Sequence, residues 1–175
     1  FTGSTNFEII SKNLTEVNTG GVFGIVFIMV GLAFKVSAVP FHMWTPDVYE
    51  GSPTSVTSFF ALVPKIAALS VFIRFMYVPF INVINQWQMI IVFLSIASMI
   101  LGAVAAIGQN NIKRLMAYSS IGHMGYALAG LATGTNAGIQ STIIYLTIYL
   151  VMNLGAFGCI FMLKREDVYF EEISE

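Results

Sequence analysis

The sequence predicts an all-α membrane protein, a polytopic helix bundle with about five transmembrane helices. Composition is the first observation: of the 175 residues, 57% are hydrophobic and 10% are charged, and the mean hydropathy is +0.80. Soluble domains contain about 25% charged residues. The length of the apolar segments is the second observation, because five of them have about the 20 residues that a helix needs to cross a bilayer. The net charge of −1 argues against a nucleic-acid partner, which normally meets a basic surface.

Residues 1–19 are polar, with scattered acids and without a basic stretch followed by an apolar one, so they do not form a signal peptide. We interpret them as a loop and expect the chain to be an internal piece of a longer protein. Residues 20–163 then form the membrane bundle, as part of one larger domain, and residues 164–175 form a charged loop.

The first predicted span is discontinuous. The apolar segment Gly21–Val39 is followed by Pro40–Pro53, which contains three prolines and cannot continue as a regular helix. This second stretch is nevertheless too apolar and aromatic for an exposed loop. We therefore predict a helix break at Pro40, soon after Lys35, followed by a short half-helix. Irregular backbone at membrane depth is tolerated only where protein buries it or it lines a cavity.

Four further segments complete the predicted bundle: Thr54–Tyr77, Met89–Ile107, Ile112–Leu131 and Gly138–Leu163. Pro64 should break or kink the first of these directly beside Lys65 and free a backbone carbonyl there. In the fourth span, Ile112–Leu131, Gly122, Gly125 and Gly130 should let helices approach closely. The single cysteine, Cys159, excludes an intrachain disulfide, and we expect it to pack in the bundle.

Basic residues predict the orientation. Alternating spans place Lys113, Arg114, Lys164 and Arg165 on one side, and only Lys12 and Arg74 on the other. The positive-inside rule makes the first side cytoplasmic, or the matrix side in a mitochondrion. Asp47 and Glu50, in the loop after the break, should lie near this inner face. We expect Asp47 to clamp the turn between spans, with proton uptake as the alternative.

Two lysines, Lys35 and Lys65, lie well inside apolar segments. A lysine at a helix centre costs roughly 2.5–3.5 kcal/mol on insertion scales, so such residues face protein or a water-filled cavity and often mark ion or proton pathways. A buried lysine can exchange a proton near neutral pH, which arginine cannot do. We therefore predict that both lysines are buried proton carriers. The alternatives are a static ion pair with an acid outside this chain and snorkelling, which works only near helix ends.

His123 lies in the middle of the fourth span, where Ser119, Ser120 and Tyr126 could extend a hydrogen-bonded path. A histidine that simply bonds to a neighbouring helix is an equal alternative. His42 follows the helix break and is either a path residue or an interface anchor. Neither histidine has a second ligand at metal-binding spacing, and the chain contains no motif for phosphate, haem or flavin binding.

Two stretches carry a resemblance to a known family. Residues Gly31–Gly51, GLAFKVSAVPFHMWTPDVYEG, closely resemble the antiporter-like subunits of proton-pumping NADH:quinone oxidoreductase, respiratory complex I. Residues Asn111–Tyr126, NIKRLMAYSSIGHMGY, resemble a second signature of these subunits. The TPDVYEG motif and Lys65 within VPKIA are most similar to the subunit N group, the homologues of mitochondrial subunit two. The resemblance covers essentially the whole chain.

The resemblance implies a proton-translocating membrane subunit. By motif, Lys35 matches the lysine of the family's interrupted seventh helix, and Lys65 matches the lysine or histidine of its eighth. The acidic and basic residues that complete the family's path lie on helices outside this chain. The resemblance also implies a chain without cofactors, since NAD, FMN, iron–sulfur clusters and quinone are handled by other subunits of the enzyme.

The implied partners are the other membrane subunits of complex I, the lipid bilayer, protons and internal water. The implied location is the bacterial plasma membrane, or the mitochondrial inner membrane for an organellar protein. Two alternatives stay open from the residues: a subunit of a multi-subunit sodium/proton antiporter, and a structural membrane subunit whose lysines only hold helices together.

Overall fold

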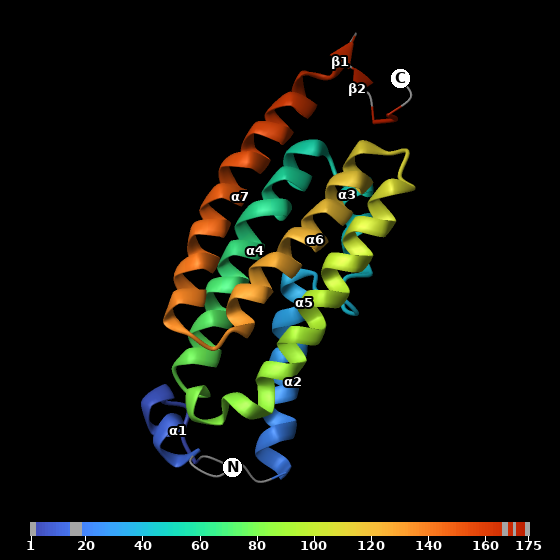
Figure 1. The fold of residues 1–175 in the computed structure, drawn as a ribbon. Helices are drawn as coiled ribbons and strands as arrows, with labels where there is room; N and C mark the ends of the chain where they lie inside the picture. The colour runs from blue at the N-terminus through green and yellow to red at the C-terminus, as the bar shows by residue number, and fades with distance from the viewer. Residues whose placement is uncertain (1–2, 15–18, 166–167, 170, 174–175) are drawn as a thin grey trace.

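The computed structural model describes residues 3–14, 19–165, 168–169 and 171–173, and it is predominantly helical. The helices are α1 Phe7–Asn13, α2 Thr19–Val36, α3 Trp44–Gly51, α4 Thr54–Tyr77, the 3-10 turn η1 Ile81–Val83, α5 Ile84–Ile107, α6 Ile112–Ala132 and α7 Asn136–Met162. Within the described residues, the strands are β1 Lys164–Arg165 and β2 Val168–Tyr169, which pair antiparallel. The predicted all-α helix bundle is confirmed (Figure 1).

The long helices lie side by side along one axis, with α1 at one end of the bundle and the β1–β2 hairpin at the other (Figure 1). Helix α6 packs against α3, α4, α5 and α7, and α4 packs against α2 and α7. Their shared core contains large side chains from every long helix, including Met29, Leu69, Trp87, Leu128 and Tyr149. Residues that chemistry could use on α4 and α6 are therefore held within the protein.

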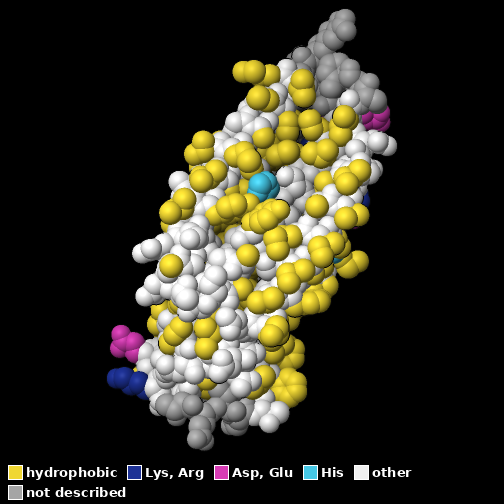
Figure 2. Space-filling model, in the orientation of Figure 1, with side chains coloured by type: hydrophobic (Ala, Val, Ile, Leu, Met, Phe, Trp, Pro, Cys, Tyr) yellow, Lys and Arg dark blue, Asp and Glu magenta, His cyan; other side chains and the backbone are white. Residues whose placement is uncertain are grey.

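Four helical segments of the described chain are long and apolar enough to cross a membrane: Thr19–Val36, Thr54–Tyr77, Ile81–Ile107 and Asn136–Met162. Hydrophobic side chains cover much of the face in Figure 2, and most charged side chains visible there lie towards its two ends. Helix α6 is less apolar than these four because it carries Lys113, Arg114 and His123. Neighbouring elements bury Lys113 and partly cover Arg114 and His123, which would be costly to place fully against lipid.

The predicted discontinuity after Lys35 is present, but the helix ends earlier than expected. Helix α2 stops at Val36, Ser37 takes a positive φ of 62°, and α3 begins at Trp44. Pro40 explains this position, because it lacks the N–H that would bond to the carbonyl of the residue four positions earlier, Val36. The predicted boundary at Val39 is therefore wrong by three residues, since a proline acts on the turn that precedes it.

Side chains satisfy backbone groups that the break sets free. The indole N–H of Trp44 donates to the Phe34 carbonyl at 3.0 Å. The Val39 N–H donates to the Ser98 hydroxyl of α5 at 2.9 Å. Buried backbone groups need such partners, so the break is an ordered part of the bundle.

The predicted break at Pro64 is absent. Helix α4 runs from Thr54 to Tyr77 as one helix with Pro64 inside it, and its bounds match the predicted span. A proline removes one backbone donor, and the carbonyl that loses its partner belongs to Phe60. The next carbonyl, that of Ala61, accepts a hydrogen bond from the hydroxyl of Tyr149 at 3.2 Å, so α7 supports α4 at this turn.

Both predicted terminal loops contain some regular structure. Residues 1–19 include α1, whose N-terminus is capped by the Asn6 side chain accepting from the Glu8 and Ile9 amides. Residues 164–175 include the β1–β2 hairpin. The parts of these two predictions that fall on residues 1–2, 15–18, 166–167, 170 and 174–175 lie outside the described residues. Cys159 is exposed, so the expectation that it packs in the bundle is wrong: it lies on an outward face of α7.

Glycines allow the close packing of α6 against its neighbours, as predicted. A Cβ added at Gly125 would lie 2.8 Å from the Met99 side chain of α5, and one added at Gly130 would collide with the Thr142 hydroxyl of α7. Gly122 faces Gly102 of α5, where the two backbones meet. Small residues at these positions bring the polar face of α6 directly against α5 and α7.

Candidate functional site

Lys65 is the centre of the candidate site. It lies in the middle of α4 with no exposed side-chain surface. Its ammonium nitrogen donates to the Ser120 hydroxyl of α6 at 2.5 Å and lies 5.1 Å from the centre of the Tyr49 ring of α3. Three helices therefore converge on one buried cation. None of the ion pairs formed by the described residues includes Lys65.

Hydrogen bonds between helices hold this arrangement in place. The Thr57 hydroxyl, two turns before Lys65 on α4, donates to the Tyr49 carbonyl at 2.9 Å and so joins α4 to α3. The Ser120 hydroxyl donates to the Ala117 carbonyl of its own helix at 2.8 Å. Its lone pairs consequently remain free to accept from the lysine.

Buried polar atoms without a partner among the described residues gather in the broken segment. They are Ser37 Oγ, His42 Nδ1, Thr45 Oγ1 and the hydroxyl oxygen of Tyr49. An unsatisfied buried polar group costs about 1–3 kcal/mol, so groups of this kind are normally hydrogen-bonded by water. The stretch from residue 37 to residue 49 therefore adds polar atoms to the interior near the buried Lys65 and Ser120.

His123 lies one turn after Ser120 on α6. Its Nδ1 is hydrogen-bonded to the Tyr145 hydroxyl of α7 at 2.6 Å, and the Tyr149 ring lies 5.2 Å away, centre to centre. Because Tyr149 also bonds to the Ala61 carbonyl, it connects the surroundings of His123 with the turn of α4 that precedes Lys65. Position 123 thus belongs to the same polar region as Lys65.

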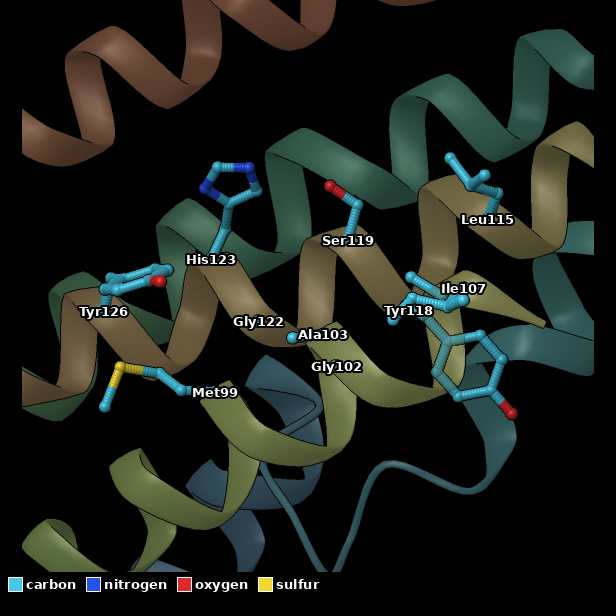
Figure 3. A pocket seen from close by; sticks show the side chains of 11 residues that line it. Met99, Gly102, Ala103, Ile107, Leu115, Tyr118, Ser119, Gly122, His123 and Tyr126 are labelled. Carbon is cyan, nitrogen blue, oxygen red and sulfur yellow. The ribbon is translucent and has the colours of Figure 1, made fainter. Parts of the chain in front are cut away.

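A groove of about 420 Å³ opens between α5 and α6 beside His123. Figure 3 shows His123, Ser119 and Tyr126 projecting from α6, with Met99 and Ala103 on α5. His123 therefore lies between the hydroxyl of Tyr145 on one side and this mostly apolar groove on the other.

Sequence reasoning did not find Tyr145 and Tyr149, although their spacing of four residues on one helix would have placed both on the same face of α7.

Lys35 is exposed, so the prediction that it is buried is wrong for the described part of the chain. The buried residues of α2 are Ile25, Met29, Ala33 and Val36, and this stripe faces the bundle. Lys35 falls outside the stripe, and no hydrogen bond or ion pair to another described residue is found for it. The structure does not bring Lys35 and Lys65 together as a bonded pair.

A cluster of ion pairs joins α3 to the start of α6. Arg114 bonds to the carboxylates of Asp47 and Glu50, each at 2.7 Å. Both acids lie on α3 and not in a loop. Asp47 joins α3 to α6 through Arg114, and its expected clamping of the turn between spans stays a prediction. Lys113 is nearly buried, bonds to the Glu171 carboxylate at 2.7 Å and donates to the Ser52 carbonyl at 3.1 Å.

His42 lies within the break and is only partly buried. No group of three or more His, Cys, Asp or Glu side chains that could hold a metal ion occurs in the described ranges. The candidate site contains a buried amine, hydroxyl groups and one imidazole, which can hold and pass protons.

Comparison with known proteins places this geometry in a family. All residues 1–175 match the family model described as NADH:quinone oxidoreductase/Mrp antiporter, transmembrane. The chain is 70% identical over 175 residues to the NADH-quinone oxidoreductase subunit N of Pelagibacter ubique and 62% identical over 178 residues to subunit N 1 of Rhizobium meliloti. Each match covers 100% of this chain and 37% of the relative, so the chain spans about a third of the curated relatives' length.

Solved structures include chains with a similar fold. A chain of respiratory complex I from Thermus thermophilus is 35% identical, with a TM-score of 0.70 over 90% of this chain and 32% of that one. A chain of the Mrp complex from Dietzia has a TM-score of 0.83 over 93% of this chain and 30% of that one, at 22% identity. The second match shows a shared fold alone.

Proposed function

Because the chain belongs to the NADH:quinone oxidoreductase/Mrp antiporter transmembrane family, we propose that it moves protons as part of a membrane subunit of NADH:quinone oxidoreductase. The observation that carries the proposal is Lys65, a fully buried amine on a membrane-spanning helix that forms no ion pair with the described residues. A buried lysine in a membrane-spanning helix is energetically costly, and such residues usually mark ion or proton pathways.

The remaining residues have distinct roles in this proposal. Ser120 accepts from Lys65 when the lysine is protonated, and the unpartnered polar atoms of the broken segment extend the polar region toward α3. His123 and Tyr145 form a second hydrogen-bonded pair near the same turn of α6. Lys35 is exposed on α2, so its partners in proton transfer belong to groups outside the described residues.

The chain itself performs no redox chemistry in this proposal. NAD, FMN, iron–sulfur clusters and quinone are bound by other subunits, and the other membrane subunits of the complex are its partners. Electron transfer supplies the driving force, and each exported proton is moved against about 2.3 kcal/mol per 100 mV of membrane potential. The bacterial plasma membrane is the proposed location, since the named relatives are bacterial.

Redox-driven pumping is favoured over sodium/proton exchange by sequence identity. The relatives at 62–70% identity are named as NADH-quinone oxidoreductase subunits, whereas the Mrp complex chain is 22% identical. A shared broken helix and a shared fold are compatible with both activities, so they do not separate them.

Replacing Lys65 in the full-length protein, within the assembled complex, tests the proposal. Lys65→Met removes the charge but fills a similar volume, so assembly and NADH oxidation by an artificial acceptor should persist while proton translocation falls at least tenfold. Lys65→His should retain part of the activity because imidazole also exchanges a proton near neutral pH. Lys35→Met and Lys35→Arg should both impair pumping, since arginine does not release its proton.

The exposed lysine at position 12 provides the matched control, and Lys12→Met should pump normally. Wild-type pumping by Lys65→Met would overturn the proposal in favour of a structural role. That role predicts an unchanged or more stable complex, because replacing a buried charge with an apolar side chain often stabilises a protein.

A further inference from the structure

The protonated form of Lys65 is not stabilised by an acid in the part of the chain that the structure describes. The described carboxylates that form ion pairs, those of Asp47, Glu50 and Glu171, bond to Arg114 and Lys113 instead. Among the described residues, the Lys65 nitrogen interacts with the Ser120 hydroxyl and the face of the Tyr49 ring. The Ser120 hydroxyl accepts one hydrogen bond from the ammonium, and the electron-rich face of the Tyr49 ring adds a second favourable interaction with it.

The Tyr49 ring is well placed to stabilise the Lys65 ammonium. Its centre lies 5.1 Å from the lysine nitrogen, within the range of about 6 Å at which a cation interacts with an aromatic face. Tyr49 and Lys65 are both fully buried. Water does not screen the interaction there, and it is stronger than the same contact on a surface.

The position of the ring is fixed by α3, which is held from two sides. The Thr57 hydroxyl of α4 bonds to the Tyr49 carbonyl. Asp47 and Glu50, which flank Tyr49 on α3, both bond to Arg114 of α6. The short helix after the break therefore places one aromatic ring over one buried cation.

We propose that Tyr49 is a positioning residue for Lys65, whose ring stabilises the ammonium form in place of a carboxylate. Helix α3 then determines how firmly Lys65 holds its proton. Besides the ion-paired Asp47, Glu50, Lys113 and Arg114, seven other titratable groups lie on the helices packed against α4: Lys35 on α2, Tyr118, His123 and Tyr126 on α6, and Tyr145, Tyr149 and Cys159 on α7. No hydrogen bond, ion pair or cation–ring contact joins any of these seven to the Lys65 nitrogen among the described residues. The inference rests on the proposed function, in which Lys65 carries a proton.

A series of fluorinated phenylalanines at position 49 tests the inference in the assembled, full-length complex. Phenylalanine and its mono-, di- and trifluoro derivatives keep nearly the same shape, but each fluorine weakens the attraction between the ring face and a cation. Proton translocation is measured against pH for each variant. A weaker ring releases the proton at lower pH, so the alkaline fall of the pumping rate should move to lower pH step by step, by roughly one pH unit over the series.

Phe72 is the matched control, because it is fully buried on the same helix as Lys65 and its ring faces no cation among the described residues. The same series at position 72 should leave the pH profile unchanged. Two results would overturn the role of the ring. One is a pH profile that does not shift across the series at position 49. The other is a loss of pumping in unfluorinated Tyr49→Phe as large as that in Tyr49→Leu. Lys65→Met separates this failure from failure of the proposed function. Normal pumping in Lys65→Met would rule out both the proposed function and the role of Tyr49. Lost pumping in Lys65→Met, together with an unshifted pH profile in the fluorinated series, would rule out only the role of Tyr49.

Discussion

Ser120 is the hydrogen-bond acceptor that the Lys65 ammonium meets among the described residues. An ammonium group has three N–H donors and no acceptor, so a dry site with one hydroxyl leaves it under-satisfied. That imbalance favours release of the proton once a better acceptor approaches. The serine therefore offers enough stabilisation to hold a charged lysine for part of a cycle without trapping it there.

Removing this hydroxyl should weaken the charged state of Lys65. We expect Ser120→Ala to lower the pumping rate roughly tenfold, because a buried donor that loses its acceptor costs about 1–3 kcal/mol. Ser120→Thr, which keeps a hydroxyl, should retain most of the rate. Ser70→Ala is the control: this exposed serine of α4 bonds only to its own helix at the Ile66 carbonyl. Equal rates in the Ser120→Ala and Ser70→Ala variants would contradict the assignment.

At the scale of helices, sequence reasoning found the elements but not all of their contacts. Hydropathy located every long helix, and three prolines after Val39 indicated the break, because both signals are local. Pro64 leaves the Phe60 carbonyl without its helical partner, as the sequence indicated, but it does not end the helix, because one missing hydrogen bond is offset by the rest of a long, packed helix. The cap provided by Asn6, by contrast, was a readable local signal for α1 that the low hydropathy of the region obscured.

In the candidate site, too, the sequence indicated residues but not their contacts. Lys65 and Lys35 occupy similar apolar surroundings in the sequence, yet one is buried and the other exposed. Which face of a helix is covered depends on its neighbours, and a pattern within one helix does not contain that information. The pairing of Lys65 with Tyr49 and Ser120 joins positions 16 and 55 residues away in the chain, so it could only come from the fold.

The packing of α5 against α6 gives an asymmetric prediction. A Cβ added at Gly102 would lie 2.6 Å from the Gly122 backbone nitrogen, whereas one added at Gly122 would meet only the Gly102 Cα at 3.9 Å. Backbone atoms cannot rotate away, so Gly102→Ala must push the two helices apart. We expect it to cost about 1–3 kcal/mol, typical of overpacking, and to lower the yield of assembled complex.

Gly122→Ala is the matched control for this prediction and should assemble at the wild-type level, as ordinary van der Waals contact is available there. Both variants add one methyl group to the same interface, so helix propensity does not distinguish them. The measurement is the amount of complex in membranes and its thermal stability in detergent. Equal behaviour of the two alanine variants would show that α5 and α6 meet in a different register.

At the scale of the whole molecule, charge is divided between the two ends of the bundle. Lys113 and Arg114 lie at the end that carries α3 and the β1–β2 hairpin, and their ion pairs tie α6 to both α3 and Glu171. Arg74 lies at the other end, 5.6 Å from the ring of Phe7, close to α1 (Figure 1). The end with the interhelical ion pairs is the one that the positive-inside rule assigns to the cytoplasm.

Labelling of single cysteines should show this orientation and the number of crossings together. In a Cys159→Ala background, from which any cysteines in the rest of the full-length protein are also removed, Lys12→Cys and Glu172→Cys place one exposed thiol at each end of the bundle. Five crossings, by α2, α4, α5, α6 and α7, separate the two positions, so an odd number puts them on opposite sides of the membrane. A membrane-impermeant maleimide should label Glu172→Cys in inverted vesicles and Lys12→Cys in right-side-out ones, with Cys159→Ala alone as the unlabelled control. Labelling of both thiols from the same side would mean that α6, the least apolar of the five, does not cross, and labelling from exchanged sides would reverse the orientation.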